Sequence, residues 1–326
     1  MSSIVFVPRR KILGRSKGKG PRGVSNTTIA LAECLAKRGH HVECVEPNNN
    51  KEVYNGVIWD TRPNLASYDL AIANLYPKTL GRVKAKQKCL WLHNPMNKWS
   101  RFRKCITGIA LHRPSAVFLS HQQHNITPAI IPYKSRHVIE HGIDDAFLRK
   151  KQYKQTPDNQ IAIFSSAPHR NLDRVIDIWK NSIHPILPNA ELHIYCDPRH
   201  VKLKESTATL NIKVKARVTH VELSKVYESA RLLIYPGHEE ETFCNAAHEA
   251  TACGLPIVTQ GIGVLSERVT HGKNGIIAKD NPAMATAIID VLSNDTTWQN
   301  LHRGSVEYRG FYTWDNRAEI WENTFL

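Results

Sequence analysis

Two glutamates with a spacing that suits hydroxyl recognition, Glu241 and Glu249, lie in the stretch Tyr235–Gly263, which reads YPGHEEETFCNAAHEATACGLPIVTQGIG. We expect a strand that ends at Pro236, an acidic loop, and a helix over Phe243–Cys253. This would place Glu241 just before the helix and Glu249 two turns along it. The unpaired N–H groups and the positive dipole end of such a helix attract an anion. The two carboxylates could then accept hydrogen bonds from hydroxyl groups on either side of that anion.

A nucleoside diphosphate sugar has this layout, with sugar hydroxyls, two phosphates and ribose hydroxyls in a row. A simpler interpretation stays open, in which Glu241 only caps the helix and Glu249 is a solvated charge. The spacing alone does not decide between these two interpretations.

A glycine-bearing loop, Gly18-Lys19-Gly20-Pro21-Arg22-Gly23, formally matches the pattern G-x-G-x-x-G. A dinucleotide fingerprint would start at the end of the strand, but about ten residues separate Gly18 from Val7. A Walker A loop would need Ser or Thr after Lys19. Two interpretations remain: the loop brings backbone N–H groups to a phosphate, or it is a flexible basic loop. We favour a phosphate contact for Gly23, which adjoins a predicted helix.

Metal and disulfide chemistry is not favoured by the sequence. The seven cysteines form no C-x-x-C pair, which fits free thiols in a reducing cytosol and argues against structural zinc. His121 and His124 are three residues apart, but we interpret them as solvated loop histidines rather than metal ligands.

The elements that must position these residues alternate between strand and helix in both halves of the chain. Such alternation predicts parallel sheets built from βαβ units. In the first half we expect a helix over 25–37 and strands over 3–7, 41–45, 70–75, 89–92, 116–119 and 137–139. After a polar linker over 149–160 we expect strands over 161–164, 191–195, 212–218, 232–235 and 255–259, with helices over 172–183, 221–230, 243–253 and 283–292 and a helical end over 298–326.

The basic charge lies entirely in the first half. Residues 1–155 hold 27 Lys and Arg against 9 Asp and Glu, a net charge of +18, whereas residues 156–326 hold 17 against 20, a net charge of −3. Such a field favours an anionic partner for the first half. A nucleic-acid partner is not favoured, because the sequence shows no interleaved aromatic residues or recognition helix.

Membrane spans and leader sequences are not expected. No stretch reaches 18 apolar residues. The first residues, MSSIVFVPRRKILGR, place their charges after a short apolar run, whereas a secretory signal places them before a longer one. We therefore expect a cytoplasmic protein.

Over most of its length, the chain resembles family 4 retaining glycosyltransferases of the GT-B fold. The Glu241 to Glu249 spacing, followed by Gly254-Leu255-Pro256, is similar to the family's donor-site signature. Further similar segments occur in the family's order, namely 22–42, 92–94, 138–144, 217–230, 264–275 and 314–325. The resemblance implies two Rossmann-like domains facing each other across a cleft, with a C-terminal helix that crosses back to the first domain. It implies domain ranges of 1–150 for acceptor binding, 151–310 for donor binding and 311–326 for the helix.

The resemblance also implies roles for single residues. Glu249 would bind the donor ribose, Glu241 the donor sugar, and Arg170 would neutralise the leaving phosphate. His93 would line the reaction centre, so the implied catalytic residues are Glu241, His93 and Arg170. The implied donor-binding residues are Gly23, Arg170, Val218, Glu241, Thr242, Phe243, Cys244, Asn245 and Glu249.

One segment departs from the family pattern. Phe164-Ser165-Ser166 stands where the family often has a Gly-Arg pair, and Asn171 replaces the usual Gly after Arg170. One expected phosphate contact is therefore missing, and the candidates to replace it are His169, Arg174 and Lys19.

The expected function is transfer of a sugar, with retention of configuration, from a nucleoside diphosphate-sugar to an anionic glycan or glycolipid acceptor. The chain contains no Asp-x-Asp, so we expect neither a metal nor a cofactor beyond this co-substrate. A lipid-linked or lipopolysaccharide-type acceptor at the inner face of an acidic membrane would explain the basic first half, and would place the protein in cell-envelope glycan biosynthesis. The alternative is a catalytically inactive protein of the same fold that binds nucleotide-sugars or glycans.

Overall fold

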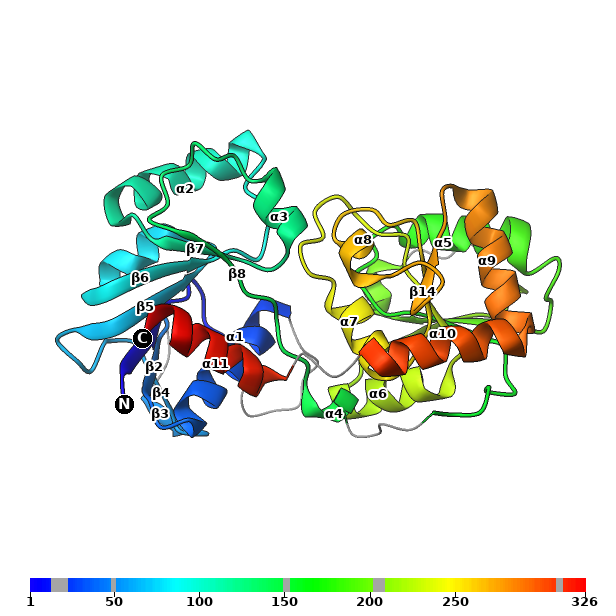
Figure 1. Cartoon of the computed structure of the whole chain (residues 1–326), viewed down its shortest axis with the longest axis horizontal. Helices are drawn as coiled ribbons and strands as arrows, with labels where there is room; N and C mark the ends of the chain where they lie inside the picture. Colours follow the sequence, from blue (N-terminus) through cyan, green and yellow to red (C-terminus); the bar gives the residue numbers. More distant parts are fainter. Residues whose placement is uncertain (13–22, 48–50, 149–152, 202–208, 309–312) are drawn as a thin grey trace. The chain divides into compact units, whose positions relative to one another are not determined.

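The protein consists of two compact units, each built around its own parallel sheet (Figure 1). The structure is a computed structural model that describes residues 1–12, 23–47, 51–148, 153–201, 209–308 and 313–326. Contacts between residues assign Met1–Gly142 and Tyr312–Leu326 to the first unit, and Ile143–Phe311 to the second. No helix in the described ranges is long and apolar enough to cross a membrane.

The first unit contains an eight-stranded sheet in the order β3-β4-β2-β1-β5-β6-β7-β8. All neighbouring strands pair in parallel except the edge strand β3, which runs antiparallel to β4. The strands are β1 (Ser3–Phe6), β2 (His41–Val45), β3 (Glu52–Tyr54), β4 (Val57–Asp60), β5 (Tyr68–Asn74), β6 (Ala85–Trp91), β7 (Ser115–Phe118) and β8 (Arg136–Val138).

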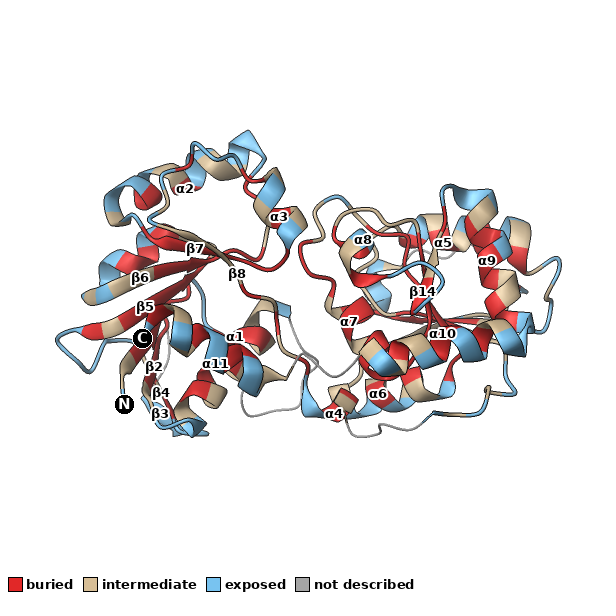
Figure 2. Ribbon diagram, in the orientation of Figure 1, coloured by how far each residue is buried: buried red, intermediate tan, exposed pale blue. Residues whose placement is uncertain are grey.

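The central strands are buried on both faces, as expected for a parallel sheet covered by helices. In β5, Ala71 and Ala73 pack in one core, together with Cys105 and Ile109 of helix α2 (Trp99–His112). The alternate residue Asn74 donates a hydrogen bond to Thr28 of helix α1 (Gly23–Lys37) at 2.7 Å. The strand's period of two therefore divides its side chains between two helical layers. The pattern of red strands and partly blue helices in Figure 2 shows this burial.

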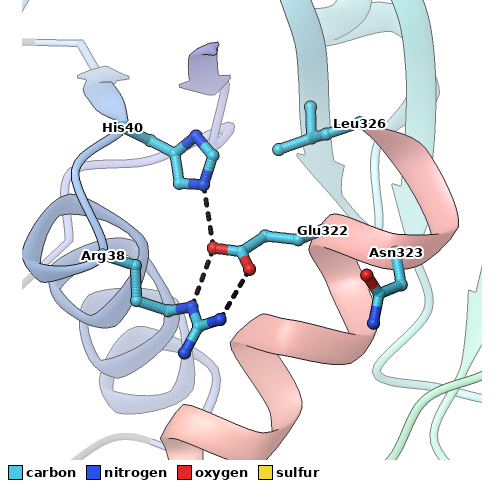
Figure 3. Close-up of a pocket in the computed structure, with 5 residues that line it drawn as sticks. All are labelled: Arg38, His40, Glu322, Asn323 and Leu326. Atoms are coloured by element: carbon cyan, nitrogen blue, oxygen red, sulfur yellow. Dashed lines mark hydrogen bonds and ion pairs between the residues drawn. The ribbon is translucent and has the colours of Figure 1, made fainter. Parts of the chain in front are cut away.

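The last helix, α11 (Trp314–Phe325), packs beside α1 in the first unit, as the sequence predicts (Figure 1). Arg38 donates two hydrogen bonds of 2.8 Å to Glu322, whose carboxylate also lies 2.8 Å from His40 Nε2. These side chains border an open pocket of about 700 Å³, which Asn323 and Leu326 also line (Figure 3). The pocket contains none of the residues proposed to bind the donor.

The second unit contains a six-stranded parallel sheet in the order β11-β10-β9-β12-β13-β14. Its strands are β9 (Ile161–Phe164), β10 (Glu191–Tyr195), β11 (Ile212–Lys215), β12 (Leu232–Ile234), β13 (Ile257–Thr259) and β14 (Gly275–Ile277). Its helices are α4 (Asp145–Leu148), α5 (Leu172–Ile178) with the π-helical turn η2 (Trp179–Ile183), α6 (His220–Ser229), α7 (Asn245–Ala252), α8 (Leu265–Arg268), α9 (Asn281–Ser293) and α10 (Asp295–Tyr308). The remaining helices are η1 (Pro77–Arg82) and α3 (His121–Ile126) in the first unit and η3 (Pro198–His200) in the second.

The observed elements differ from the predicted ones in several places. Helix α2 was not predicted, nor were the shorter helices η1, α3, α4, η3 and α8. The units divide after Gly142 rather than at residue 150, because α4 packs against α6 and α7 of the second unit. Strands β3 and β4, and the short strand β14, have no counterpart in the predicted set. Each is only three or four residues long, so its pattern is too short to distinguish from a loop.

Candidate functional site

Helix α7 is preceded by a loop that carries most of the predicted donor residues. The helix begins at Asn245, two residues later than predicted, because Cys244 takes a left-handed conformation with φ 61° and ψ 75°. His248 N–H donates to the Cys244 carbonyl oxygen at 3.1 Å. Glu241 therefore lies one turn before the helix, and Glu249 lies about one turn along it rather than two.

Glu241 is held in place by its neighbours. The Tyr235 hydroxyl, at the end of β12, donates a hydrogen bond of 2.6 Å to Glu241 Oε2. Arg170 Nε lies 3.5 Å from the same oxygen. The other carboxylate oxygen, Oε1, accepts no hydrogen bond from any residue in the described ranges. One oxygen thus anchors the side chain, and the other is available for a hydroxyl group.

The Arg170 guanidinium also contacts His238, at 3.2 Å between Nη1 and Nδ1. The Glu240 N–H donates to the same His238 nitrogen at 3.1 Å. The Nδ1 atom of His238 thus accepts both hydrogen bonds. His238 thereby orients Arg170 without competing for its partner Glu241.

The loop that holds His238 and Glu241 fits closely against the loop after β13. Gly237 has φ +101°, and an added Cβ would lie 2.6 Å from the Ile262 carbonyl oxygen. Gly263 has φ +66°, and an added Cβ would lie 2.4 Å from the His238 carbonyl oxygen. Both positions need glycine for conformation and for space, so the two loops act as a single support for Glu241.

The structure explains one departure from the family pattern. Asn171 has φ 65° and ψ 33°, a left-handed conformation. Gly adopts this conformation most readily, and Asn is among the few other residues that adopt it. Its side-chain amide donates to the Gly237 carbonyl oxygen. Asn171 therefore preserves the turn after Arg170 and also connects it to the loop that carries His238.

Glu249 lies in a different environment from Glu241. It is half-buried and accepts no hydrogen bond from residues that the structure describes. Burial raises its pKa to about 7; the nearby His220 opposes this rise and Asp144 adds to it. His220 and Asp144 form an ion pair of 3.0 Å, and Phe147 packs against the His220 ring at 5.3 Å.

The other predicted donor residues of the second unit lie at the start of α7, in the loop before it, or just before α6. Val218 precedes α6, which Thr219 caps through a reciprocal pair of bonds with Glu222. Thr242 and Phe243 are buried, and the guanidinium of buried Arg268 lies 4.4 Å from the centre of the Phe243 ring. Burial raises the pKa of the Cys244 thiol well above its ordinary value, so this side chain is a neutral packing group. Asn245 starts the helix.

The residues suggested as substitutes for the missing phosphate contact differ in their surroundings and their contacts. Arg174 donates to the Gln260 side chain. Partial desolvation and, to a lesser extent, the charge of Arg170 lower the pKa of His169, so it is neutral at pH 7. Ser165 and Ser166 hydrogen-bond to the hydroxyls of Tyr227 and Tyr235, respectively. Lys19 lies outside the described residues, as do Gly18 and Gly20.

Two of the predicted residues belong to the first unit. Gly23 is the first residue of α1. His93, just after β6, is buried with its ring 4.6 Å from Trp91 and 5.5 Å from His141. Burial lowers its pKa well below the ordinary value, and His141 adds to this effect. His93 is therefore a neutral imidazole.

Metal ligands do not gather in the described part of the chain, where no group of three or more His, Cys, Asp or Glu side chains is placed to hold an ion. His121 and His124 both lie on α3, and the His124 ring packs against Phe118.

Four residues of the site were not among those predicted, namely Tyr235, His238, His220 and Asp144. Tyr235 and His238 stand next to the acidic loop, so their position was a signal that could have been used. Asp144 pairs with His220, which lies 76 positions away in the sequence, and no local sequence pattern predicts this contact.

Solved structures with the GT-B architecture match the whole fold. Sucrose-phosphate synthase from Thermosynechococcus elongatus superposes with a TM-score of 0.76 at 16% identity, covering 100% of this chain and 98% of that one. Anabaena HepE in complex with UDP and glucose gives a TM-score of 0.73 at 16% identity, covering 99% of each chain. WaaG, a glycosyltransferase involved in lipopolysaccharide biosynthesis, gives 0.68 at 12% identity and covers 99% of each chain. The chain has the GT-B fold.

Residues 159–294 match the model of the family described as Glycosyl transferases group 1. A curated relative, D-inositol 3-phosphate glycosyltransferase from Corynebacterium diphtheriae, is 33% identical over 106 residues, which are 32% of this chain and 25% of the relative. Its counterpart from Catenulispora acidiphila is 29% identical over 110 residues, 33% of this chain and 26% of the relative. The matched segment thus spans about a quarter of the length of these relatives.

Proposed function

We propose that the protein is a retaining glycosyltransferase that takes a sugar from a nucleoside diphosphate-sugar and needs no metal ion. The observation that carries this proposal is the pair of carboxylates around the start of α7, one anchored beside Arg170 and one half-buried beside the Asp144–His220 pair. The match of residues 159–294 to the Glycosyl transferases group 1 family supports it.

The donor would lie along the start of α7. Glu241 Oε1 would accept hydrogen bonds from the sugar hydroxyls, and Glu249 would accept them from the ribose. The first N–H groups of a helix have no intrahelical acceptor, so the beginning of α7 would face the diphosphate. HepE is solved with UDP and glucose, and UDP is therefore the first nucleotide to test.

Arg170 would stabilise the leaving group. Breaking the bond between the sugar and the diphosphate develops positive charge on the sugar carbon and negative charge on the departing phosphate. A fixed cation beside that phosphate lowers the energy of the transition state more than that of the ground state. Its contacts with Glu241 and His238 keep the guanidinium fixed before the donor arrives. Gly23 and neutral His93 would serve from the first unit, at the diphosphate and beside the transferred sugar.

The acceptor is proposed to be an anionic glycan or glycolipid bound by the basic first unit. Residues 1–155, which include most of the first unit, carry a net charge of +18, and this charge favours such a partner. A lipid-linked acceptor at the inner face of the membrane would make the protein a cytoplasmic enzyme of cell-envelope glycan synthesis that associates peripherally with that surface.

Alanine variants test the donor site. Glu249→Ala and Arg170→Ala should each lower donor turnover by at least about 100-fold, because each removes a charged contact to the donor. Glu239→Ala is the matched control, since Glu239 is an exposed carboxylate of the same loop, and it should keep wild-type turnover. Full activity in both variants, with unchanged circular dichroism, would defeat the assignment.

The alternative is a protein of the same fold that binds nucleotide-sugars or glycans without catalysis. The observation that favours it is that Ser165 and Ser166 bond to Tyr227 and Tyr235 at the place where the family often has a phosphate-binding Gly-Arg pair. Calorimetric binding of a nucleotide-sugar, without turnover against a panel of acceptors, would support this alternative.

A further inference from the structure

The outer face of helix α2 in the first unit combines exposed apolar side chains with unpaired cations. Trp99 is 69% exposed and Leu111 is 77% exposed. Arg103 and Lys104 lie between them along the helix, are exposed, and form no ion pair with any described residue. We call Trp99, Arg103, Lys104 and Leu111 the α2 face.

The buried side of the same helix accounts for its other residues. Cys105 and Ile109 pack in the core on that side of the sheet, and Phe102 packs against it. Gly108 allows close contact with η1, since an added Cβ would lie 2.8 Å from the Lys78 backbone nitrogen. The helix is thus anchored by one side, while Trp99 at its start lies 5.5 Å from the Phe102 ring between centroids and stays largely exposed. Figure 2 shows exposed residues along this helix.

The charge around α2 has one sign over a long stretch. Residues 70–139 contain twelve Lys and Arg and no Asp or Glu. All of them lie in the first unit and within the described ranges. Surface cations that only keep a protein soluble are normally interspersed with acidic residues. Lys86 of this stretch pairs with Asp69 at 2.8 Å, whereas Arg103 and Lys104 pair with no described carboxylate. The remaining excess of one sign complements an extended anionic surface.

We propose that the α2 face docks the first unit onto an acidic lipid bilayer. Trp99 and Leu111 lie about 18 Å apart along the helix axis, from the rise per residue, so both ends of the helix would enter the interface. Tryptophan and leucine insert at the headgroup boundary while Arg and Lys pair with anionic headgroups.

The combination of groups selects lipid over other anions. A nucleic acid or a free anionic glycan would pair with Arg103 and Lys104 but would leave Leu111 in water. This inference rests on the part of the proposed function that places the acceptor at an acidic membrane. It does not depend on the donor site, so failure of the two can be distinguished.

The test is sedimentation of the full chain with vesicles of phosphatidylglycerol mixed into phosphatidylcholine. Wild-type protein should bind these vesicles in a salt-sensitive manner and should bind pure phosphatidylcholine at least about tenfold more weakly, because each Lys or Arg near an acidic surface contributes about fivefold. Trp99→Ser with Leu111→Ser, and Arg103→Gln with Lys104→Gln, should each weaken binding at least about tenfold. Trp99→Phe keeps an aromatic ring at this position, so it should bind the acidic vesicles much more strongly than the variant with Trp99→Ser and Leu111→Ser.

Matched controls use equivalent residues away from α2. Val53→Ser changes another side chain of the first unit that is 68% exposed, and Lys180→Gln with Lys279→Gln removes two exposed cations from the second unit. Both should bind like wild type. All variants should keep wild-type donor turnover on a soluble acceptor. The inference is overturned if the wild-type protein does not bind acidic vesicles, or if the Trp99→Ser, Leu111→Ser variant binds them as wild type does. It is also overturned if RNA competes with the vesicles equally well for binding of the two double variants.

Discussion

At the residue scale, the two glutamates of the site differ in the partners that surround their carboxyl groups. Glu241 is fixed by the Tyr235 hydroxyl and lies beside Arg170, so its carboxylate has a donor and a cation close by. Glu249 has neither as a direct partner among the described residues, and burial raises its pKa to about 7. The same residue type therefore serves as a fixed acceptor in one case and as a group that titrates near neutral pH in the other.

Glu249 should make stability depend on pH. Its folded-state pKa of about 7 lies above its ordinary value of 4.5, so the folded protein binds this proton more tightly than the unfolded chain does. The stabilisation is complete below pH 4.5 and is lost as the pH rises through 7. Glu249→Gln should therefore raise the free energy of unfolding by about 1–2 kcal/mol near pH 8, a value discounted for the partial exposure of the carboxyl.

Urea denaturation near pH 5 and near pH 8 checks this prediction, because the wild-type and variant proteins should converge at the lower pH. Glu239→Gln provides the control, since Glu239 is exposed and should show no such difference. Parallel pH profiles for wild type and Glu249→Gln would mean that Glu249 is ionised in the folded protein at both pH values.

Asn171 allows a test of backbone conformation. Alanine in the left-handed region costs about 1–2 kcal/mol, and Asn171→Ala also removes the hydrogen bond to Gly237. Asn171→Gly removes the same hydrogen bond but tolerates the conformation. We expect the glycine variant to be more stable than the alanine variant by about 1 kcal/mol. Equal midpoints in urea would show that φ at this position is not what requires Asn.

At the element scale, α11 is held to α1 by a compact network of charges. Arg38 and His40 both contact Glu322 (Figure 3), and Arg38 also pairs with Asp315. The hydrogen bonds from Arg38 lower the pKa of Glu322, and those from His40 add to the effect. On its inner side the same helix places Trp321 5.4 Å from Trp91 of β6. Since Trp91 in turn contacts His93, α11 supports the element that carries this histidine.

Removing the charge of Glu322 should loosen the helix. Glu322→Gln should destabilise α11 by about 1 kcal/mol, because the pairs are partly exposed to solvent. Hydrogen exchange over 314–325 measures this. Because the pKa of Glu322 is lowered, its contribution is present above pH 4.5 and is lost as the pH falls through the folded-state value.

Glu319→Gln is the control for that experiment, since it makes the same change at an exposed position of the same helix. It should leave the exchange over 314–325 unchanged. If both variants raise the exchange rate equally, the general charge of α11 holds the helix, and the specific pairing with Arg38 does not.

At the scale of the whole molecule, charge and binding residues are divided between the two units. The anchored glutamate, the arginine and the start of α7 lie in the second unit, where the net charge is close to balance, whereas the basic excess lies in the first. This division is the physical basis for proposing a donor on one unit and an anionic acceptor on the other.

Ligand binding should therefore stabilise the protein selectively. A nucleoside diphosphate that binds only the folded state should add about 2.7 kcal/mol at a concentration 100 times its Kd. We expect a rise in melting temperature with one of UDP, GDP or ADP, and no rise with that nucleotide in the Glu249→Ala variant. Stabilisation by a nicotinamide dinucleotide in place of all three would contradict the proposed donor site.

The sequence by itself determined the alternation of strands and helices, the two parallel sheets, and the segment around α7. Apolar runs of four to seven residues between helical patterns are local signals, and a buried parallel sheet imposes them directly on the chain. The Glu241 and Glu249 positions were visible for the same reason, because both lie within one short segment. Edge strand β3 and the exact start of α7 could not be predicted from the sequence, because a three-residue strand and a left-handed Cys244 leave no periodic pattern.

Only the tertiary structure decided which side chains meet. The contacts of Arg170 with His238 and Glu241, of Asp144 with His220, and of Arg38 with Glu322 join residues between 68 and 284 positions apart. Such pairs form because sheets bring the ends of distant strands and helices together, and the energy of each contact depends on burial that no short segment encodes. The raised pKa of Glu249, the fixed geometry of Arg170 and the outward face of α2 are therefore properties of the fold.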